Sequence, residues 1–202
     1  FQAMDLDGDP PRPNYNIAPT QTVVGIRGTD PRHLDLFRWG LLPFWARDVS
    51  IGSRMFNARG EMVATKPSFR NAFKSRRCLI PADGFYEWTG PKGQRQPHHI
   101  HRVDGHLMAF AGLWESHDEF GQSCTIVTCE PNDFMAHLHN RMPVILEPEN
   151  WDRWLDDGAE SEALHALIAP AADGVLASYA VTPAVGSVKN NGPELAEPLP
   201  PR

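Results

Sequence analysis

Hydrophobic and polar residues alternate along several short stretches of the chain, which predicts β-strands rather than long helices. The first two stretches, residues 22–27 and 34–40, are expected to pair as a hairpin. Residues 107–114 and 123–128 are apolar for most of their length, as is typical of buried strands. A further strand is predicted over residues 176–181.

A single acid, Glu87, interrupts an aromatic strand that follows the apolar strand 78–82 after an Asp-Gly turn or bulge. Alternation places Tyr86 and Trp88 on one face of this strand, and Phe85 and Glu87 on the other. A carboxyl group on an apolar face is costly to ionise, so its pKa should rise. Glu87 is therefore a candidate proton donor or acceptor near neutral pH. The alternative is that Phe85 faces the core while Glu87 reaches solvent, as most acids do.

The helices are predicted to be few and short. Prolines and capping residues mark where they start. One helix is expected over 67–73, and a second over 134–138, after Pro131-Asn132-Asp133. A third runs from Pro148 through Trp151, Trp154 and Leu155, and a fourth follows a Ser161 cap, with Leu164, Leu167 and Ile168 facing inward. The tail 198–202 is expected to be disordered. With no internal repeat or linker, the pattern predicts one α+β domain over residues 1–202. Its sheet should be highly curved or barrel-like.

Composition agrees with a soluble globular protein, since 41% of the 202 residues are hydrophobic and 22% are charged. No apolar run approaches the roughly 18 residues that span a membrane. Cys78, Cys124 and Cys129 are too few for a disulfide framework and lack metal-binding spacing, so we expect buried thiols and a cytoplasmic location. The chain begins at Phe1 with no initiator Met and no visible signal peptide, so a truncated start is expected.

The net charge of −6 argues against a protein that coats duplex DNA without specificity. Residues 54–77, however, carry seven basic side chains against one acid, Glu61. Either this segment binds an anionic partner, or it is a solvated basic loop. Three large aromatics, Trp39, Phe44 and Trp45, precede it, and each belongs either to the core or to a surface that stacks on a base.

Three histidines follow the turn 90–93 that returns the chain from the Glu87 strand. His99 and His101 share one face of the returning strand, next to His98. No third ligand has a recognisable spacing, so we predict no metal and no cofactor.

Six motifs in a fixed order resemble the SRAP family, the SOS response-associated peptidases, which are regarded as abasic-site processing proteins. They are Tyr15-Asn16-Ile17-Ala18-Pro19-Thr20, Trp39-Gly40-Leu41-Leu42-Pro43, Asn57-Ala58-Arg59-Gly60-Glu61, Ala82-Asp83-Gly84-Phe85-Tyr86-Glu87-Trp88, His139-Asn140-Arg141-Met142-Pro143 and Val188-Lys189-Asn190. The resemblance implies an SRAP-like α+β fold, with a curved, partly closed (barrel-like) and mainly antiparallel β core and flanking helices. It also implies recognition of abasic sites in single-stranded DNA, with a covalent thiazolidine crosslink made by the Cys that follows the initiator Met. Autoproteolytic removal of that Met and an associated lyase activity are implied as well.

The resemblance assigns catalytic roles to three side chains. Glu87 matches the acid–base residue, His139 matches the residue that assists opening of the sugar ring, and Asn57 matches the amide that orients amine and sugar. A histidine suits this role because its charge can change near neutral pH. Two alternatives stay open, namely that Glu87 is an idle surface acid and that His139 only caps a helix C-terminus.

The resemblance also implies a set of DNA contacts: Arg59 and Arg141 for phosphates, Trp45 as an aromatic wedge, and Asn16, Pro19 and Lys189 as further contacts. A planar guanidinium suits phosphate oxygens, although Arg141 can instead be a structural partner of an acid. The implied partner is abasic single-stranded DNA, bound by a monomer that joins the nucleoid after damage.

This sequence departs from the family pattern at its start, where the Cys-Gly-Arg segment is absent. None of the three cysteines can replace that Cys, because the chemistry needs an α-amine and a thiol on one residue. The chain as given should therefore form no thiazolidine. Two other functions remain open, a thiol peptidase that cleaves other proteins and a non-covalent module for single-stranded DNA.

Overall fold

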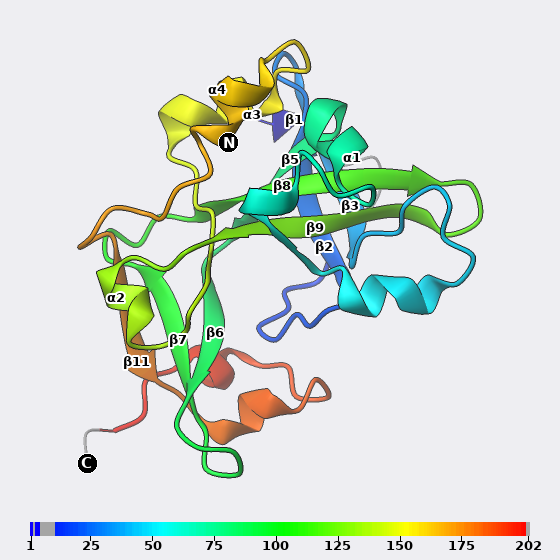
Figure 1. Cartoon of the computed structure of the whole chain (residues 1–202). Helices are drawn as coiled ribbons and strands as arrows, with labels where there is room; N and C mark the ends of the chain where they lie inside the picture. Colours follow the sequence, from blue (N-terminus) through cyan, green and yellow to red (C-terminus); the bar gives the residue numbers. More distant parts are fainter. Residues whose placement is uncertain (2, 5–10, 201–202) are drawn as a thin grey trace.

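The computed structural model describes residues 1, 3–4 and 11–200, and it contains two β-sheets (Figure 1). The larger sheet has the order β1-β3-β2-β5-β8-β9-β10, with β4 paired to β9, and the smaller has the order β11-β7-β6. The strands of the larger sheet are β1 (Ala3–Met4), β2 (Thr22–Arg27), β3 (Arg32–Trp39), β4 (Asn57–Arg59), β5 (Arg77–Ala82), β8 (Met108–His117), β9 (Gly121–Cys129) and β10 (Met142–Pro143). Those of the smaller sheet are β6 (Gly84–Thr89), β7 (Gln96–Arg102) and β11 (Leu176–Ala180).

The larger sheet curves into a ring that is not fully closed. β2 and β3 form the predicted antiparallel hairpin, and the pairs β5–β8 and β8–β9 are also antiparallel. β3 then pairs with β9 in parallel over two residue pairs, which brings the two ends of the sheet together. The parallel pairs β1–β3 and β4–β9 complete it. The predicted α+β class with a curved, barrel-like and mainly antiparallel core is confirmed.

The helices are short, as predicted, and α1, α3 and α4 lie above β8 and β9 in the view of Figure 1. They are α1 (Arg70–Ser75), α2 (Asp133–Ala136), α3 (Trp151–Leu155) and α4 (Ser161–His165), with 3-10 turns η1 (Val49–Arg54), η2 (Gly60–Met62), η3 (Pro148–Asn150), η4 (Pro183–Gly186) and η5 (Pro193–Ala196). Asn132 caps α2 by accepting from the Met135 amide. The Ser161 cap is wrong, because Ser161 is the first helical residue and Glu160 takes the cap position without a side-chain bond.

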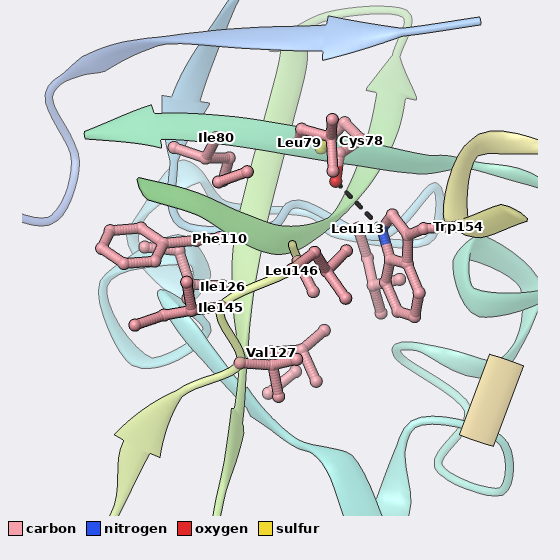
Figure 2. Close-up of a cluster of buried hydrophobic side chains, with 14 of the residues drawn as sticks. Cys78, Leu79, Ile80, Phe110, Leu113, Ile126, Val127, Ile145, Leu146 and Trp154 are labelled. Carbon is pink, nitrogen blue, oxygen red and sulfur yellow. Dashed lines mark hydrogen bonds between the residues drawn. The ribbon is translucent and has the colours of Figure 1, made fainter. Parts of the chain in front are cut away.

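The core is one cluster of apolar side chains from the strands and helices (Figure 2). Trp154 of α3 is fully buried in it and donates its indole N–H to the carbonyl of Cys78 at 3.0 Å. The cluster also contains Ile100 and Leu176 from the smaller sheet. This shared core is consistent with a single domain over residues 1–202, which stays a prediction.

All three cysteines are free and buried, as the sequence predicted. Burial raises the pKa of Cys129 to about 11 and raises the pKa values of Cys78 and Cys124 as well. A buried thiol with a raised pKa is a poor nucleophile. Within the described part of the chain, no helix has both the length and the apolar character required to cross a membrane.

The link between β5 and β6 carries the chain from the larger sheet to the smaller through Asp83 alone. Gly84 follows at a point where a side chain has no room, since an added Cβ would clash with the His99 ring and lie 2.8 Å from the Ile100 carbonyl oxygen. This close crossing fixes the start of the strand that carries Glu87.

The C-terminal tail is tied to the smaller sheet as far as it is described. The Leu199 amide donates to the carbonyl of Ala180 at 2.9 Å. The predicted disorder from residue 198 is therefore wrong for residues 198–200, while residues 201–202 lie outside the described part.

Candidate functional site

Glu87 lies in the middle of β6, opposite His98 of β7. On the face that it shares with Phe85, the Phe85 ring packs edge-on against Phe110 of β8, with centroids 5.9 Å apart. Tyr86 points to the other face and packs against His99, at 5.3 Å between centroids. The predicted alternation is confirmed, and it places Glu87 on the same face of β6 as the partly buried Phe85.

The environment of Glu87 suits proton transfer. Its side chain is only 25% exposed. Burial raises the pKa of Glu87 above its ordinary value, while the imidazole of His139, the Trp88 amide and the charge of Arg95 act in the opposite direction. The direction agrees with the sequence prediction. A carboxyl group whose pKa is raised toward neutrality can both accept and release a proton during turnover.

His139 approaches Glu87 from the loop that follows α2, with Nδ1 3.8 Å from Oε1 of the acid. The same Nδ1 lies 3.1 Å from the backbone nitrogen of Arg141 and 3.1 Å from its carbonyl oxygen. A deprotonated Nδ1 can accept from that amide, and a protonated Nδ1 can donate to that carbonyl. The loop therefore supplies a partner for the ring in both protonation states, which is useful for an acid–base residue.

Arg141 is engaged with the protein itself. Its guanidinium donates to both carboxylate oxygens of Glu61 in η2, and to the carbonyl of Thr128 in β9 at 2.7 Å. The structure thus shows the alternative that Arg141 is a structural partner of an acid. The sequence assigned no role to Glu61, because its ion pair with Arg141 joins residues 80 positions apart and leaves no local signal in the sequence.

Asn57 and Arg59 occupy alternate positions of β4, with the buried Ala58 between them. Both side chains are exposed on one face of the strand. Arg59 pairs in register with Thr128, whose carbonyl accepts from Arg141. These contacts link the backbone of β4 through Thr128 and Arg141 to His139, and they do not include the side chains of Asn57 and Arg59.

The loop before η1 presents two large aromatic side chains to solvent. Trp45, the predicted wedge, is 44% exposed, and Phe44 is 66% exposed. Trp39 is instead held inside, where its indole N–H donates to the carbonyl of Phe56 at 2.8 Å. Sequence patterning did not separate these three residues, and the resemblance assigned the wedge role to Trp45 alone, although Phe44 is also exposed and could stack on a base.

Asn16 is largely buried and bonds to the protein itself. It is 6% exposed, and its amide nitrogen donates to the carbonyls of Val185, Ser187 and Asn190. It therefore holds the loop that presents the exposed Lys189, and its predicted contact with DNA stays a prediction.

Pro19 and Lys189 lie in loops at the surface of the protein. Pro19 is partly exposed next to Thr20, whose φ is 79°. Lys189 lines a shallow hollow of about 520 Å³ together with Asn190, Asn191 and Glu194. Both positions leave room for a DNA contact, which stays a prediction for each of them.

The basic segment 54–77 divides into internal and exposed charges. Arg77 is buried and donates to the carbonyls of Phe73, Trp154 and Asp156. Arg76 pairs with the buried Glu115 at 2.6 Å. The other bases of the segment are exposed, so the surface charge is smaller than the sequence count suggested.

His99 and His101 stack with centroids 5.9 Å apart, on the face of the smaller sheet that faces away from Glu87. His99 lies 3.1 Å from the hydroxyl of Tyr179, which donates to the Ala196 carbonyl. The described residues contain no group of three His, Cys, Asp or Glu side chains placed to hold a metal ion. This pair belongs to the packing between β7, β11 and the C-terminal segment.

Comparison with known proteins gives a consistent picture. Residues 1–188 match the model of the family described as SOS response associated peptidase (SRAP). The chain is 44% identical to the abasic site processing protein YoqW of Bacillus subtilis over 92% of this chain and 86% of that protein. It is 32% identical to the abasic site processing protein YedK of Escherichia coli, over 96% and 89% of the two chains. A crystal structure of a protein from Bacteroides thetaiotaomicron superposes with a TM-score of 0.80 at 25% identity, over 89% and 82% of the two chains.

Proposed function

Because the chain belongs to the SOS response-associated peptidase family, we propose that it senses and processes abasic sites in single-stranded DNA. The observation that carries the proposal is the approach of His139 to the partly buried Glu87, at 3.8 Å. Two proton-transfer groups within reach of one small substrate are what opening and trapping a sugar aldehyde requires. Relatives named as abasic site processing proteins, at 44% and 32% identity, support the same activity.

The proposed chemistry begins with the α-amine of the family's N-terminal Cys, which is not among these 202 residues. An α-amine with a pKa of roughly 7.7–8.0 is nucleophilic near neutrality once a base takes its proton. His139 gives a proton to the ring oxygen of the abasic sugar as the bond from that oxygen to the anomeric carbon breaks, the anomeric hydroxyl group loses its proton to solvent water, and an aldehyde results. The amine adds to the aldehyde carbon, water leaves, and an imine forms. The thiol then adds to the imine carbon, its proton passes to the nitrogen, and the thiazolidine ring closes.

Glu87 accepts the proton of the attacking amine and returns one to the departing hydroxyl group. The same acid–base pair supports the reverse reaction, removal of the initiator Met, and β-elimination from the imine, which is the lyase activity. Asn57 orients amine and sugar through its amide, without adding charge to the site. The proposal assigns no step to Cys78, Cys124 or Cys129, whose thiols are buried.

We propose that DNA follows the exposed surface next to this pair. Arg59 holds a phosphate, Trp45 and Phe44 stack on bases, and Lys189 and Pro19 extend the contact. Arg141 contributes to this surface only if DNA displaces its protein partners. A bound single strand needs no second copy of the protein, so a monomer is proposed. Joining the nucleoid after damage stays a prediction.

A test uses the full-length protein with matched oligonucleotides that do or do not contain one abasic site. A heat-stable covalent band with abasic DNA alone supports the proposal. Cleavage of unrelated peptides would instead indicate a thiol peptidase. Reversible binding to both DNAs without a covalent band would indicate a module that only binds single strands.

A further inference from the structure

The ion pair between Glu61 and Arg141 connects two elements that are far apart in the sequence. Nη1 of Arg141 lies 2.5 Å from Oε1 of Glu61, and Nη2 lies 2.9 Å from Oε2. Two parallel bonds of this kind fix the plane of the guanidinium as well as its position. A third bond, from Nη2 to the Thr128 carbonyl at 2.7 Å, anchors the same group to β9.

The backbone of Arg141 in turn holds the His139 ring. Its amide and its carbonyl each lie 3.1 Å from Nδ1 of His139. The ring is 45% exposed, so a large part of it faces solvent rather than packed side chains. The placement of the Arg141 backbone therefore sets how closely His139 approaches Glu87.

We propose that Glu61 is a positioning residue for the abasic-site chemistry, because its carboxylate fixes Arg141 and thereby holds His139 beside Glu87. This inference rests on the proposed function and deepens it. The alternative is that Glu61 only occupies Arg141 until a DNA phosphate replaces it. The geometry favours positioning, since the Arg141 guanidinium donates to four acceptor atoms on two elements of the protein, and a phosphate would have to break the two bonds to Glu61. Arg141 lowers the pKa of Glu61, so this carboxylate is charged at neutral pH.

The test compares Glu61→Gln with Glu130→Gln in the full-length protein. Both acids line the same hollow of about 310 Å³, but only Glu61 bonds to Arg141. Single-turnover crosslinking to abasic DNA is measured against DNA concentration. Glu61→Gln should lower the maximal rate by roughly 10- to 100-fold, the effect of a small misplacement of a reacting group. The half-saturating DNA concentration should stay within about twofold, because the phosphate contacts are unchanged. Glu130→Gln should match the wild type in both quantities.

A second readout does not depend on the chemistry. The NMR signals of the His139 ring, identified by their loss in His139→Gln, should shift in Glu61→Gln and stay in place in Glu130→Gln. Wild-type rates with unmoved ring signals would overturn the inference. Tighter binding of intact single-stranded DNA by Glu61→Gln at an unchanged rate would overturn it as well, since Glu61 would then compete with phosphate. If the wild type itself forms no adduct, the proposed function fails, and the ring signals still decide whether Glu61 positions His139.

Discussion

The Nδ1 atom of His139 lies 3.8 Å from Oε1 of Glu87, although one residue belongs to a loop after α2 and the other to the centre of β6. This contact joins the smaller sheet to the segment that follows the last long strand of the larger one. In the sequence, a lone acid among aromatic residues and a histidine in a loop are each a weak signal. Their proximity in the fold makes them one candidate acid–base pair.

Glu87→Gln should slow crosslink formation and crosslink reversal while leaving binding intact. Loss of a positioned acid–base group lowers a rate by roughly 10²- to 10⁴-fold. The affinity for intact single-stranded DNA should change by less than about twofold, because Glu87 carries none of the proposed phosphate or stacking contacts. Rates are measured by denaturing electrophoresis and affinity by fluorescence anisotropy. An equal loss of binding would mean that Glu87 is structural.

Glu87→Gln should also stabilise the protein relative to the wild type, by an amount that grows as the pH rises. Burial raises the pKa of Glu87 in the folded state, so the folded protein binds this proton more tightly than the unfolded chain. The stability contributed by the protonated acid is present at low pH and is lost as the pH rises through the folded pKa. The neutral Gln avoids that loss, so the Tm advantage of Glu87→Gln should grow as the pH rises above about 4.3, the ordinary pKa of Glu. The exposed Glu119→Gln is the control, and a Tm difference that shrinks with pH would contradict the raised pKa.

Trp45→Ala and Phe44→Ala should each weaken binding to single-stranded DNA by roughly 1–3 kcal/mol if their rings stack on bases. Leu36→Ala serves as the control, because Leu36 is also an exposed large apolar residue but lies on β3. Binding is measured by anisotropy with intact oligonucleotides at fixed salt concentration. If all three variants bind like the wild type, the exposed aromatics of this loop do not contact DNA.

Gly84→Ala should destabilise the protein by roughly 1–3 kcal/mol, since an added methyl group would overfill a packed site. The new Cβ would clash with the His99 ring and approach the Ile100 carbonyl oxygen to 2.8 Å. Gly186→Ala is the matched control, because a Cβ there would meet no atom within 4 Å among the described residues. Urea unfolding compares the two variants. Equal stability would mean that the crossing from β5 to β6 can relax without cost.

Local patterning was enough to predict the longer strands and to place Glu87 on the same face of β6 as Phe85, but it did not predict the short strands β1, β4 and β10. The hairpin of β2 and β3 and the faces of β6 follow from alternation over a few residues, which the sequence displays directly. The four helices were also located, although α1 begins at Arg70 rather than at residue 67 and Ser161 does not cap α4. Helix ends depend on side-chain bonds and packing that a local pattern does not encode.

Contacts between residues that are far apart in the chain could not be predicted from the sequence. The parallel pairing of β3 with β9, which curves the larger sheet into an incomplete ring, joins segments more than 80 residues apart. The burial of Asn16 under the loop 185–190 and the bond of Glu61 to Arg141 likewise join distant segments. For Asn16, Glu61 and Arg141, the residue type fits two roles, a ligand contact or an internal hydrogen bond. Only the folded arrangement distinguishes between those roles.

The most direct measurement is a structure of the full-length protein bound to single-stranded DNA with one abasic site. We expect the abasic sugar to lie with Glu87, His139 and Asn57 around it, each within roughly 2.6–3.2 Å of a polar atom of the sugar or of the attacking amine. A sugar bound elsewhere on the protein, or one that these three side chains cannot reach together, would contradict the proposed site.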